Sequence, residues 1–450
     1  MSDPEEAEAE DRGPAQRAAG EVDAGRPAAA AEPGAGGGGA RLRRFLSYLA
    51  LAGPGLIAAN AGNDAGGIAT YASAGAQFRY RTLLFMVVVT VALVVVQEMS
   101  ARLGAYTGKG LAALIREEFS VRVAGFALLC LVVANTGLVV SEFAGIGAAM
   151  ELFHVSRYIS IPAFAAAIWA VVVFSSYSYA ERVFLLLSLV FLTYPLAALL
   201  GHPHWATVAN NTVIPHFTAD RDFIFLGVAL IGTTITPYMQ LYGAAGVVDR
   251  GIGPDEYRYE RIDAVSGVIF ANVISMFIII ATATAIGGHG PLTSAKDAAL
   301  ALKPVAGAGA EALFGVGLLG ASALAGAVVP LSTSYAVSEA LGVERSVSRS
   351  FAEAPLFLGL FTVQVVVGAA VALRPGSLFR LLLQTQVLQG VITPVILTFI
   401  LILANRRSVL GEAVNGPRFR KVAWISVAGA AAFAAVYLGQ SLLGLVGLGP

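Results

Sequence analysis

An aspartate stands in the middle of the first long apolar segment of this chain. Asp64 lies in the run Gly62-Asn63-Asp64-Ala65-Gly66-Gly67, where glycines interrupt the apolar residues. A break in a membrane helix frees backbone carbonyls, and it is tolerated where the backbone is buried or lines a water-filled cavity. Carboxylate and carbonyl oxygens are the ligands that hard divalent cations take. We therefore expect a cation site formed by Asp64 with Ala61 and Gly67, although Asp64 could at the same time cap the following helix.

A second apolar segment is interrupted near residue 236. Pro237 cannot donate a backbone hydrogen bond, so the carbonyl about one turn earlier, at Thr233, is expected to be free. Thr236, beside the break, adds a hydroxyl oxygen to the same region. Two interrupted segments at corresponding places in two halves of a membrane protein indicate the substrate site of a transporter. Thr233 and Thr236 are thus predicted to complete the cation site.

The composition is that of an integral membrane protein. Hydrophobic residues make up 57% of the 450 residues and charged residues only 13%, with a mean hydropathy of +0.74, whereas soluble domains carry about 25% charged residues. Apolar runs long enough to cross a bilayer fill residues 45–447, which we interpret as one all-α transmembrane domain. About eleven spans are predicted, centred near Gly62, Val91, Gly137, Val171, Leu189, Gly232, Ile274, Leu324, Val365, Leu397 and Ala431.

The two broken spans are the first and the sixth. Spans one to five and six to ten therefore form two halves that each begin with a broken helix. Because each half has an odd number of spans, the second half must run in the opposite direction through the membrane, which is the inverted-repeat plan of leucine-transporter-like carriers. The eleventh span is an addition to this 5+5 arrangement.

The distribution of basic residues predicts the orientation. With the N-terminus in the cytoplasm, most of the 29 Lys and Arg residues lie on the cytoplasmic side, as the positive-inside rule requires. Eleven spans then place the C-terminus outside a multi-pass protein of the cell membrane. Residues 1–40 are rich in Ala, Gly, Glu and Pro and lack large apolar side chains, so we expect a disordered cytoplasmic tail.

Several function classes are disfavoured. The chain has no GxxxxGK[ST] sequence and no cytoplasmic stretch long enough for an ATPase domain, and no His lies within a span to serve as the base of an intramembrane enzyme. We expect no enzyme activity, no bound cofactor and no nucleic-acid partner. A carrier of sodium and an amino acid is disfavoured because Asp64 would repel the substrate carboxylate. A membrane scaffold without transport would leave the cost of burying Asp64 unexplained.

In these motifs the chain resembles the NRAMP metal transporters. Their first broken helix carries the motif Asp-Pro-Gly-Asn, which reads Asp64-Ala65-Gly66-Gly67 here, and their Met-Pro-His of the sixth helix reads Thr236-Pro237-Tyr238. Further similarities follow along the chain at Gly53-Pro54-Gly55, Ala101-Arg102-Leu103-Gly104 and Thr385-Gln386-Val387.

Departures from the NRAMP motif alter the chemistry that the resemblance implies. Gly67 replaces the metal-binding Asn, and Thr236 replaces a Met whose thioether favours soft transition metals. Tyr238 stands in place of a His linked to proton movement, and Val139 in place of an acid of the proton route, while Glu142 is retained. This pattern is similar to the NRAMP-related magnesium transporters.

The resemblance covers roughly residues 45–447, and the segments 319–325 and 330–333 also look like the magnesium branch. It implies a secondary carrier of divalent cations that works by alternating access, with Mg²⁺ favoured and Mn²⁺ also carried, weakly or not coupled to protons. Glu142, Tyr238 and Gln386 would form a polar or proton-linked network beside the site. The alternative is a proton-coupled Mn²⁺/Fe²⁺ importer of the conventional NRAMP type. The oligomeric state is left open by the sequence.

Overall fold

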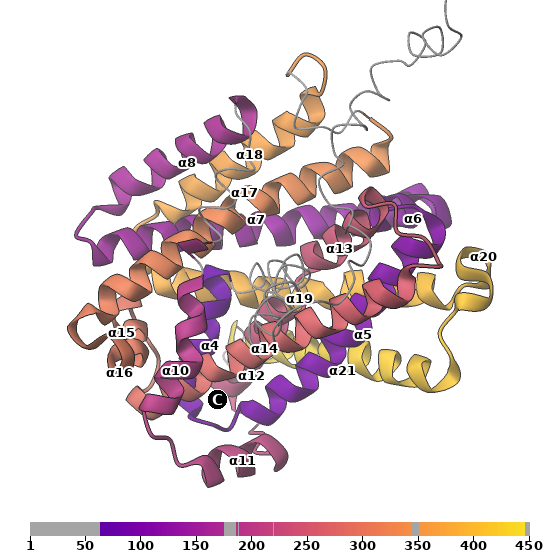
Figure 1. Cartoon of the computed structure of the whole chain (residues 1–450). Coiled ribbons are helices and arrows are strands. Elements are labelled where there is room, and N and C mark those ends of the chain that lie inside the picture. Colours follow the sequence, from indigo (N-terminus) through magenta and orange to yellow (C-terminus); the bar gives the residue numbers. More distant parts are fainter. Residues whose placement is uncertain (1–63, 175–185, 188, 219, 344–350, 446–450) are drawn as a thin grey trace, which may run out of the picture. The chain divides into compact units, whose positions relative to one another are not determined.

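The computed structural model describes residues 64–174, 186–187, 189–218, 220–343 and 351–445, and this part of the chain is all helical (Figure 1). The tail at residues 1–40, Ala61 and the first half of the first predicted span therefore lie outside the described residues. The confirmed all-α fold class follows from long apolar sequences, because a helix satisfies all its backbone hydrogen bonds within one segment.

Nine helical segments of the described residues are long and apolar enough to cross a membrane. They correspond to nine of the eleven predicted spans, and the predicted spans centred at Gly62 and Leu189 include residues that the structure does not describe. The long single helices are α5 (Leu83–Thr107), α7 (Val121–Leu152), α8 (Arg157–Phe174), α14 (Tyr257–Ile286), α17 (Ala310–Leu341), α18 (Pro355–Ala372), α19 (Leu378–Asn405) and α21 (Pro417–Leu445).

Shorter elements cover the ends of these helices or form parts of the two broken spans. The α-helices among them are α4 (Ala65–Phe78), α6 (Leu111–Glu118), α10 (Thr193–Leu200), α11 (Trp205–Val213), α12 (Arg221–Thr234), α13 (Pro237–Asp249), α15 (Ala295–Ala299), α16 (Lys303–Ala306) and α20 (Arg407–Leu410). Single 3-10 turns are η1 (Leu189–Leu192), η2 (Leu300–Leu302), η3 (Gly307–Gly309) and η4 (Gly411–Ala413).

The sixth span is broken where the sequence predicts it. Helix α12 ends at Thr234 and α13 begins at Pro237, so Ile235 and Thr236 form the break. Pro237 occupies the first helical position of α13, where its missing N–H would in any case have no helical partner. At its N-terminal end α12 is capped by Asp220, which accepts a hydrogen bond from the Phe223 amide (2.8 Å).

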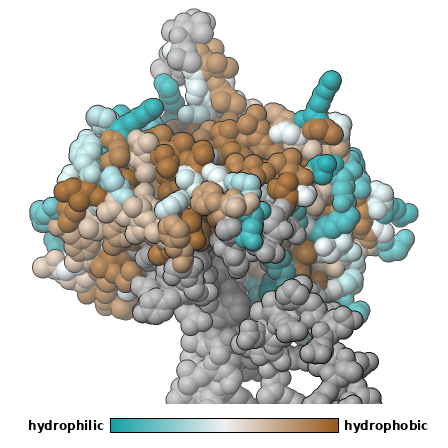
Figure 2. Space-filling model, turned by 90° about the horizontal axis from the view of Figure 1, so that it is seen from above, coloured by the Kyte–Doolittle hydropathy of each residue, from teal (hydrophilic) through white to brown (hydrophobic). Residues whose placement is uncertain are grey.

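Apolar side chains cover much of the surface. In Figure 2 they occupy the middle of the visible face, and hydrophilic side chains gather largely toward its left and right margins, where the helices of Figure 1 end. Large exposed apolar residues on this kind of surface include Val88, Phe126, Leu129 and Val363. Lipid tails accept such side chains without cost, so the pattern fits helices that cross a bilayer.

Helix α7 packs against both α17 and α19, and α18 and α8 also lie beside α7 (Figure 1). Helix α19 also packs closely against α12. A Cβ atom at Gly232 of α12 would collide with the backbone of Gln386 and Gly390, and one at Gly390 would collide with the carbonyl of Val228. Small residues permit such close backbone approach between membrane helices, and the contact fixes α12, which ends at the break.

This contact predicts a stability difference between two glycines. Gly232→Ala should lower the melting temperature of the detergent-solubilised protein, because the backbone of α19 must move to admit the methyl group at a cost of about 1–3 kcal/mol. Gly246→Ala is the matched control, since a Cβ there meets nothing within 4 Å. Equal melting temperatures for the two variants would contradict the tight α12–α19 contact.

Candidate metal centre

Asp64 caps the N-terminus of α4. Its Oδ1 accepts a hydrogen bond from the backbone amide of Gly67 (2.5 Å), and only 3% of the residue is exposed. A carboxylate at this position satisfies an amide that has no helical partner and lies at the positive end of the helix dipole. The capping role considered from the sequence is therefore realised. It also fixes the carboxylate in the protein interior, which a direct role in cation binding requires.

Gly67 brings α4 into contact with the second broken span. A Cβ atom at position 67 would lie 2.8 Å from Oγ1 of Thr233 and 3.0 Å from Oδ1 of Asp64. The two predicted site residues Asp64 and Thr233 thus meet at Gly67, although they come from different halves of the chain. The Thr233 hydroxyl is buried and makes no hydrogen bond of good geometry among the described residues, although it interacts with the hydroxyl of Tyr71 on α4. Its oxygen keeps a lone pair that a ligand could use.

The lack of a side chain at Gly67 does not leave an open space in this conformation. From the sequence, the absence of the Asn side chain suggests a roomier site. The structure instead shows that Thr233 and Asp64 fill the position that a Cβ would take. The reason is that glycine allows α4 and α12 to approach, which the sequence of α4 alone does not reveal.

Thr236 lies in the break between α12 and α13. It is buried, 1% exposed, and its hydroxyl also has no partner among the described residues. The neighbouring carbonyl, that of Ile235, lies 3.2 Å from the Thr393 hydroxyl of α19, whose single proton it shares with the closer Gln389 carbonyl (2.8 Å). A carbonyl has two lone pairs, so this bond leaves capacity for a second contact.

Glu142 of α7 lies against the start of α4. Its Oε2 is 3.5 Å from the backbone nitrogen of Ala65, the residue after Asp64, and its Oε1 has no partner among the described residues. The residue is fully buried. Tyr238, which is buried in the first turn of α13, lies within electrostatic range of the carboxyl groups of both Asp64 and Glu142. Three of the predicted residues therefore share one electrostatic environment.

Gln386 also lies against the start of α4. Its amide nitrogen is 3.4 Å from the Ser141 hydroxyl, and a Cβ at Gly66 would collide with this amide group. The Oε1 of Gln386 is buried without a partner among the described residues. Gln386 therefore lines the start of α4 together with Ser141, next in sequence to Glu142.

Sequence reasoning missed three contributors to this region. Gly66 provides the space for the Gln386 amide, Thr393 holds the carbonyl of the break, and Tyr71 contacts the hydroxyl of Thr234 (3.2 Å). A signal for Thr393 was present, because Gln386, Gln389 and Thr393 have the i, i+3, i+7 spacing of one helix face.

Two acids, Asp64 and Glu142, are the charged groups of this region. Within the described residues no group of three or more His, Cys, Asp or Glu side chains is arranged to hold a metal ion. The predicted donors around Asp64 are instead hydroxyl and backbone oxygens. Such a set resembles the mixed carboxylate and neutral oxygen coordination of hard cations.

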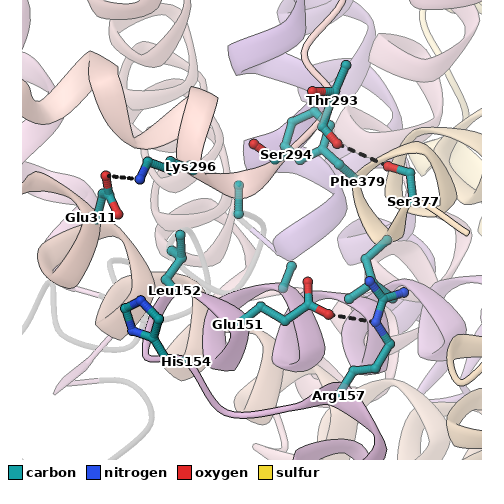
Figure 3. Close-up of a pocket in the computed structure, with 13 residues that line it drawn as sticks. Glu151, Leu152, His154, Arg157, Thr293, Ser294, Lys296, Glu311, Ser377 and Phe379 are labelled. Carbon is teal, nitrogen blue, oxygen red and sulfur yellow. Dashed lines mark hydrogen bonds and ion pairs between the residues drawn. The ribbon is translucent and has the colours of Figure 1, made fainter.

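Two cavities of the described residues lie away from this region. One, of about 410 Å³, is formed at the ends of α7 and α17 together with α15 and the start of α19. Figure 3 shows that its wall carries two ion pairs, Glu151 with Arg157 and Lys296 with Glu311. The other is a groove of about 440 Å³ between α6, α13 and α17. The predicted site residues line neither cavity.

A membrane-spanning helix broken beside a buried carboxylate is typical of secondary carriers with inverted repeats. A family model described as "Natural resistance-associated macrophage protein-like" matches residues 55–440. The chain therefore belongs to this family, which is the NRAMP family predicted from the motifs.

Known relatives cover most of the chain. It is 26% identical over 410 residues to the "Divalent metal cation transporter MntH" of Ralstonia nicotianae, covering 85% of this chain and 89% of that protein. The MntH of Bacillus subtilis is also 26% identical, with 86% and 91% covered. The crystal structure of the Eremococcus coleocola manganese transporter superposes with a TM-score of 0.73 at 18% identity, covering 93% and 91%. This likeness confirms the predicted fold.

The contact at Gly67 yields a test of the site geometry. Gly67→Ala should weaken cation uptake by about tenfold, because the methyl group displaces the Thr233 hydroxyl or the Asp64 carboxylate at a cost of about 1–3 kcal/mol. Thr233→Ala removes the oxygen that the methyl group meets. In a double-mutant cycle, the combined variant should therefore lose less than the sum of the two single losses. Strict additivity would show that the two positions do not meet.

Proposed function

We propose that this protein carries divalent metal cations across the cell membrane by alternating access, with Mg²⁺ favoured and Mn²⁺ also carried. The observation that carries the proposal is the meeting of Asp64 with the Thr233 hydroxyl at Gly67, where α4 contacts the last turn of α12 before the break. A buried carboxylate is costly in a membrane domain, and a divalent cation would compensate its charge. The similar proteins described above, a divalent metal cation transporter and a manganese transporter, support the class of cargo.

Preference for Mg²⁺ is inferred from the donor atoms. The hydroxyls of Thr233 and Thr236 and the carboxylate of Asp64 are hard oxygen donors, and neither hydroxyl makes a hydrogen bond of good geometry among the described residues. Hard oxygen sites suit Mg²⁺, which also retains several waters, whereas thioethers favour softer metals. In the resembling family a Met occupies the position of Thr236. These donor atoms support the proposal that this protein belongs to the NRAMP-related magnesium branch.

Uptake into proteoliposomes tests this function. We expect saturable Mg²⁺ uptake, with Mn²⁺ as a competitor, and a loss of at least about tenfold in Asp64→Asn, since a charge-assisted contact is worth about 1.5–3 kcal/mol. Asp222→Asn is the matched control, because this exposed aspartate lies in the first turn of α12 away from the break. Full uptake by Asp64→Asn would remove Asp64 from the site. Mn²⁺ uptake that Mg²⁺ does not inhibit would favour the conventional importer.

Weak or absent proton coupling is inferred from the surroundings of Glu142. One turn away on α7, Val139 faces α18, where a Cβ at Gly368 would lie 2.6 Å from Cγ1 of Val139 and 3.0 Å from the Phe143 ring. Apolar groups therefore lie between α7 and α18 at the position where the NRAMP motif has an acid. Glu142 is left without a titratable neighbour on this side of α7.

Internal pH recorded during cation uptake tests the coupling. We expect little or no acidification of proteoliposomes as the cation enters, because a proton-coupled carrier needs a series of titratable groups. Acidification that follows metal entry and disappears in Glu142→Gln, but persists in the control Glu151→Gln at the exposed end of α7, would contradict this expectation. It would instead support the second candidate, a proton-coupled Mn²⁺/Fe²⁺ importer, which the manganese transporter among the similar structures favours.

A further inference from the structure

The sequence Ala101-Arg102-Leu103-Gly104 near the end of α5 has no part in the cation site, yet it makes unusual contacts. Arg102 is buried, 8% exposed, and lies one helical turn after Glu98, which is 4% exposed. Its Nη2 is 3.0 Å from Oε2 of Glu98. Charged residues are rarely buried unless they are paired. The segments of the chain that this ion pair connects therefore indicate its role.

Arg102 connects α5 to the segment between α19 and α21. Its Nη1 donates to the carbonyl of Ala413 (2.8 Å), and its Nη2 also donates to Oδ1 of Asn415. The guanidinium lies 5.4 Å from the centre of the Phe419 ring in the first turn of α21. A planar guanidinium is suited to such simultaneous contacts. Asn415 in turn donates to the sulfur of Met99 on α5 (3.4 Å).

Glu98 connects the same part of α5 to α14. The Tyr257 hydroxyl donates to its Oε1 (2.5 Å), and Nε of Arg261 lies 3.7 Å from this oxygen. The carboxylate therefore holds the first turns of α14 against α5. Together the contacts join α5, α14 and the start of α21 at one end of the helices, the end predicted to be cytoplasmic.

Helix α5 is also fixed to α13, which begins directly after the break. The Ser100 hydroxyl is 3.3 Å from Oε1 of Gln240, and a Cβ at Gly104 would lie 2.7 Å from the carbonyl of Ala244. These contacts lie on either side of Arg102 along α5, so the stretch of α5 that carries Arg102 is also the stretch that packs against α13. Helix α13 carries Thr236 at its N-terminus, so this line of contacts ends at the candidate metal centre.

We propose that Glu98, Arg102 and Asn415 form a latch that stabilises the conformation of this structure and opens during each transport cycle. Alternating access moves one group of helices against another around the site. A buried ion pair adds little net stability, because its desolvation offsets much of its attraction, and in this protein we assign the pair to the selection of one arrangement of the helices. The three residues are thus positioning residues for transport through α5 and α13. This proposal does not depend on which divalent cation is carried.

Thiol labelling of the groove between α13 and α17 tests the latch. Ala245 lines this groove and is partly exposed. In a Cys130→Ala background, Ala245→Cys is labelled with a maleimide in lipid nanodiscs, where both faces are accessible. Arg102→Ala should change the population of this conformation and lower the labelling rate by at least about fivefold, a typical allosteric coupling. Arg102→Lys, which keeps the charge but not the planar fork, should give an intermediate rate.

A second variant gives an effect of the opposite sign. Asn415→Asp places a carboxylate on the guanidinium of Arg102 and should strengthen the latch. Labelling at Ala245→Cys should then be no slower than in the parent, while the maximal rate of Mn²⁺ uptake falls because the latch opens less often. A residue that only supports folding would not give a folded variant with faster or equal labelling and slower transport.

Arg406 provides the matched control. It lies at the same end of the helices, pairs with Glu118 (3.1 Å) and lies over the Phe119 ring (4.5 Å), but these partners belong to α6 and its C-terminal end. Arg406→Ala should keep the parent labelling rate. Unchanged labelling in folded Arg102→Ala, or an equal decrease in Arg406→Ala, would overturn the latch. If Arg102→Ala does not fold, Arg102→Lys and Asn415→Asp decide the question by the same criteria.

Discussion

The structure depends on one electrostatic constraint, a carboxylate buried at the start of a half-helix. Asp64 is tolerated there because the amide of Gly67 and the dipole of α4 stabilise its charge. The same requirement explains the surrounding polar atoms. The hydroxyls of Thr233 and Thr236 and the Oε1 of Gln386 are buried without a hydrogen bond of good geometry among the described residues, an arrangement that is costly unless a ligand or water completes it.

Features set by a single residue type could be predicted from the sequence. Pro237 ends the hydrogen-bond pattern of any helix that contains it, so the break between α12 and α13 was predictable. The depth of Asp64 within an apolar run likewise indicated a functional site. The long apolar runs predicted all nine described spans. The motif at Asp64 and Thr236 led to the family that the family model confirms.

Features that depend on pairs of distant residues could not be predicted. The sequence gives no sign that Thr233 would occupy the position opened by Gly67, because this depends on how closely α4 approaches α12. The hydroxyl of Thr393 on the Ile235 carbonyl and the contact of Gln386 with Gly66 are equally tertiary. Arg102 was noticed only as part of a motif, since its partners Ala413 and Asn415 lie about 310 positions further along the chain.

The contact between Gly67 and Thr233 has a consequence for how this site could have diverged from its relatives. A larger residue at position 67 disturbs its neighbour, because the first added carbon would lie 2.8 Å from the Thr233 hydroxyl. A smaller residue at position 233, or a wider spacing of α4 and α12, would relieve this contact. Positions 67 and 233 are therefore expected to vary together among relatives of this chain.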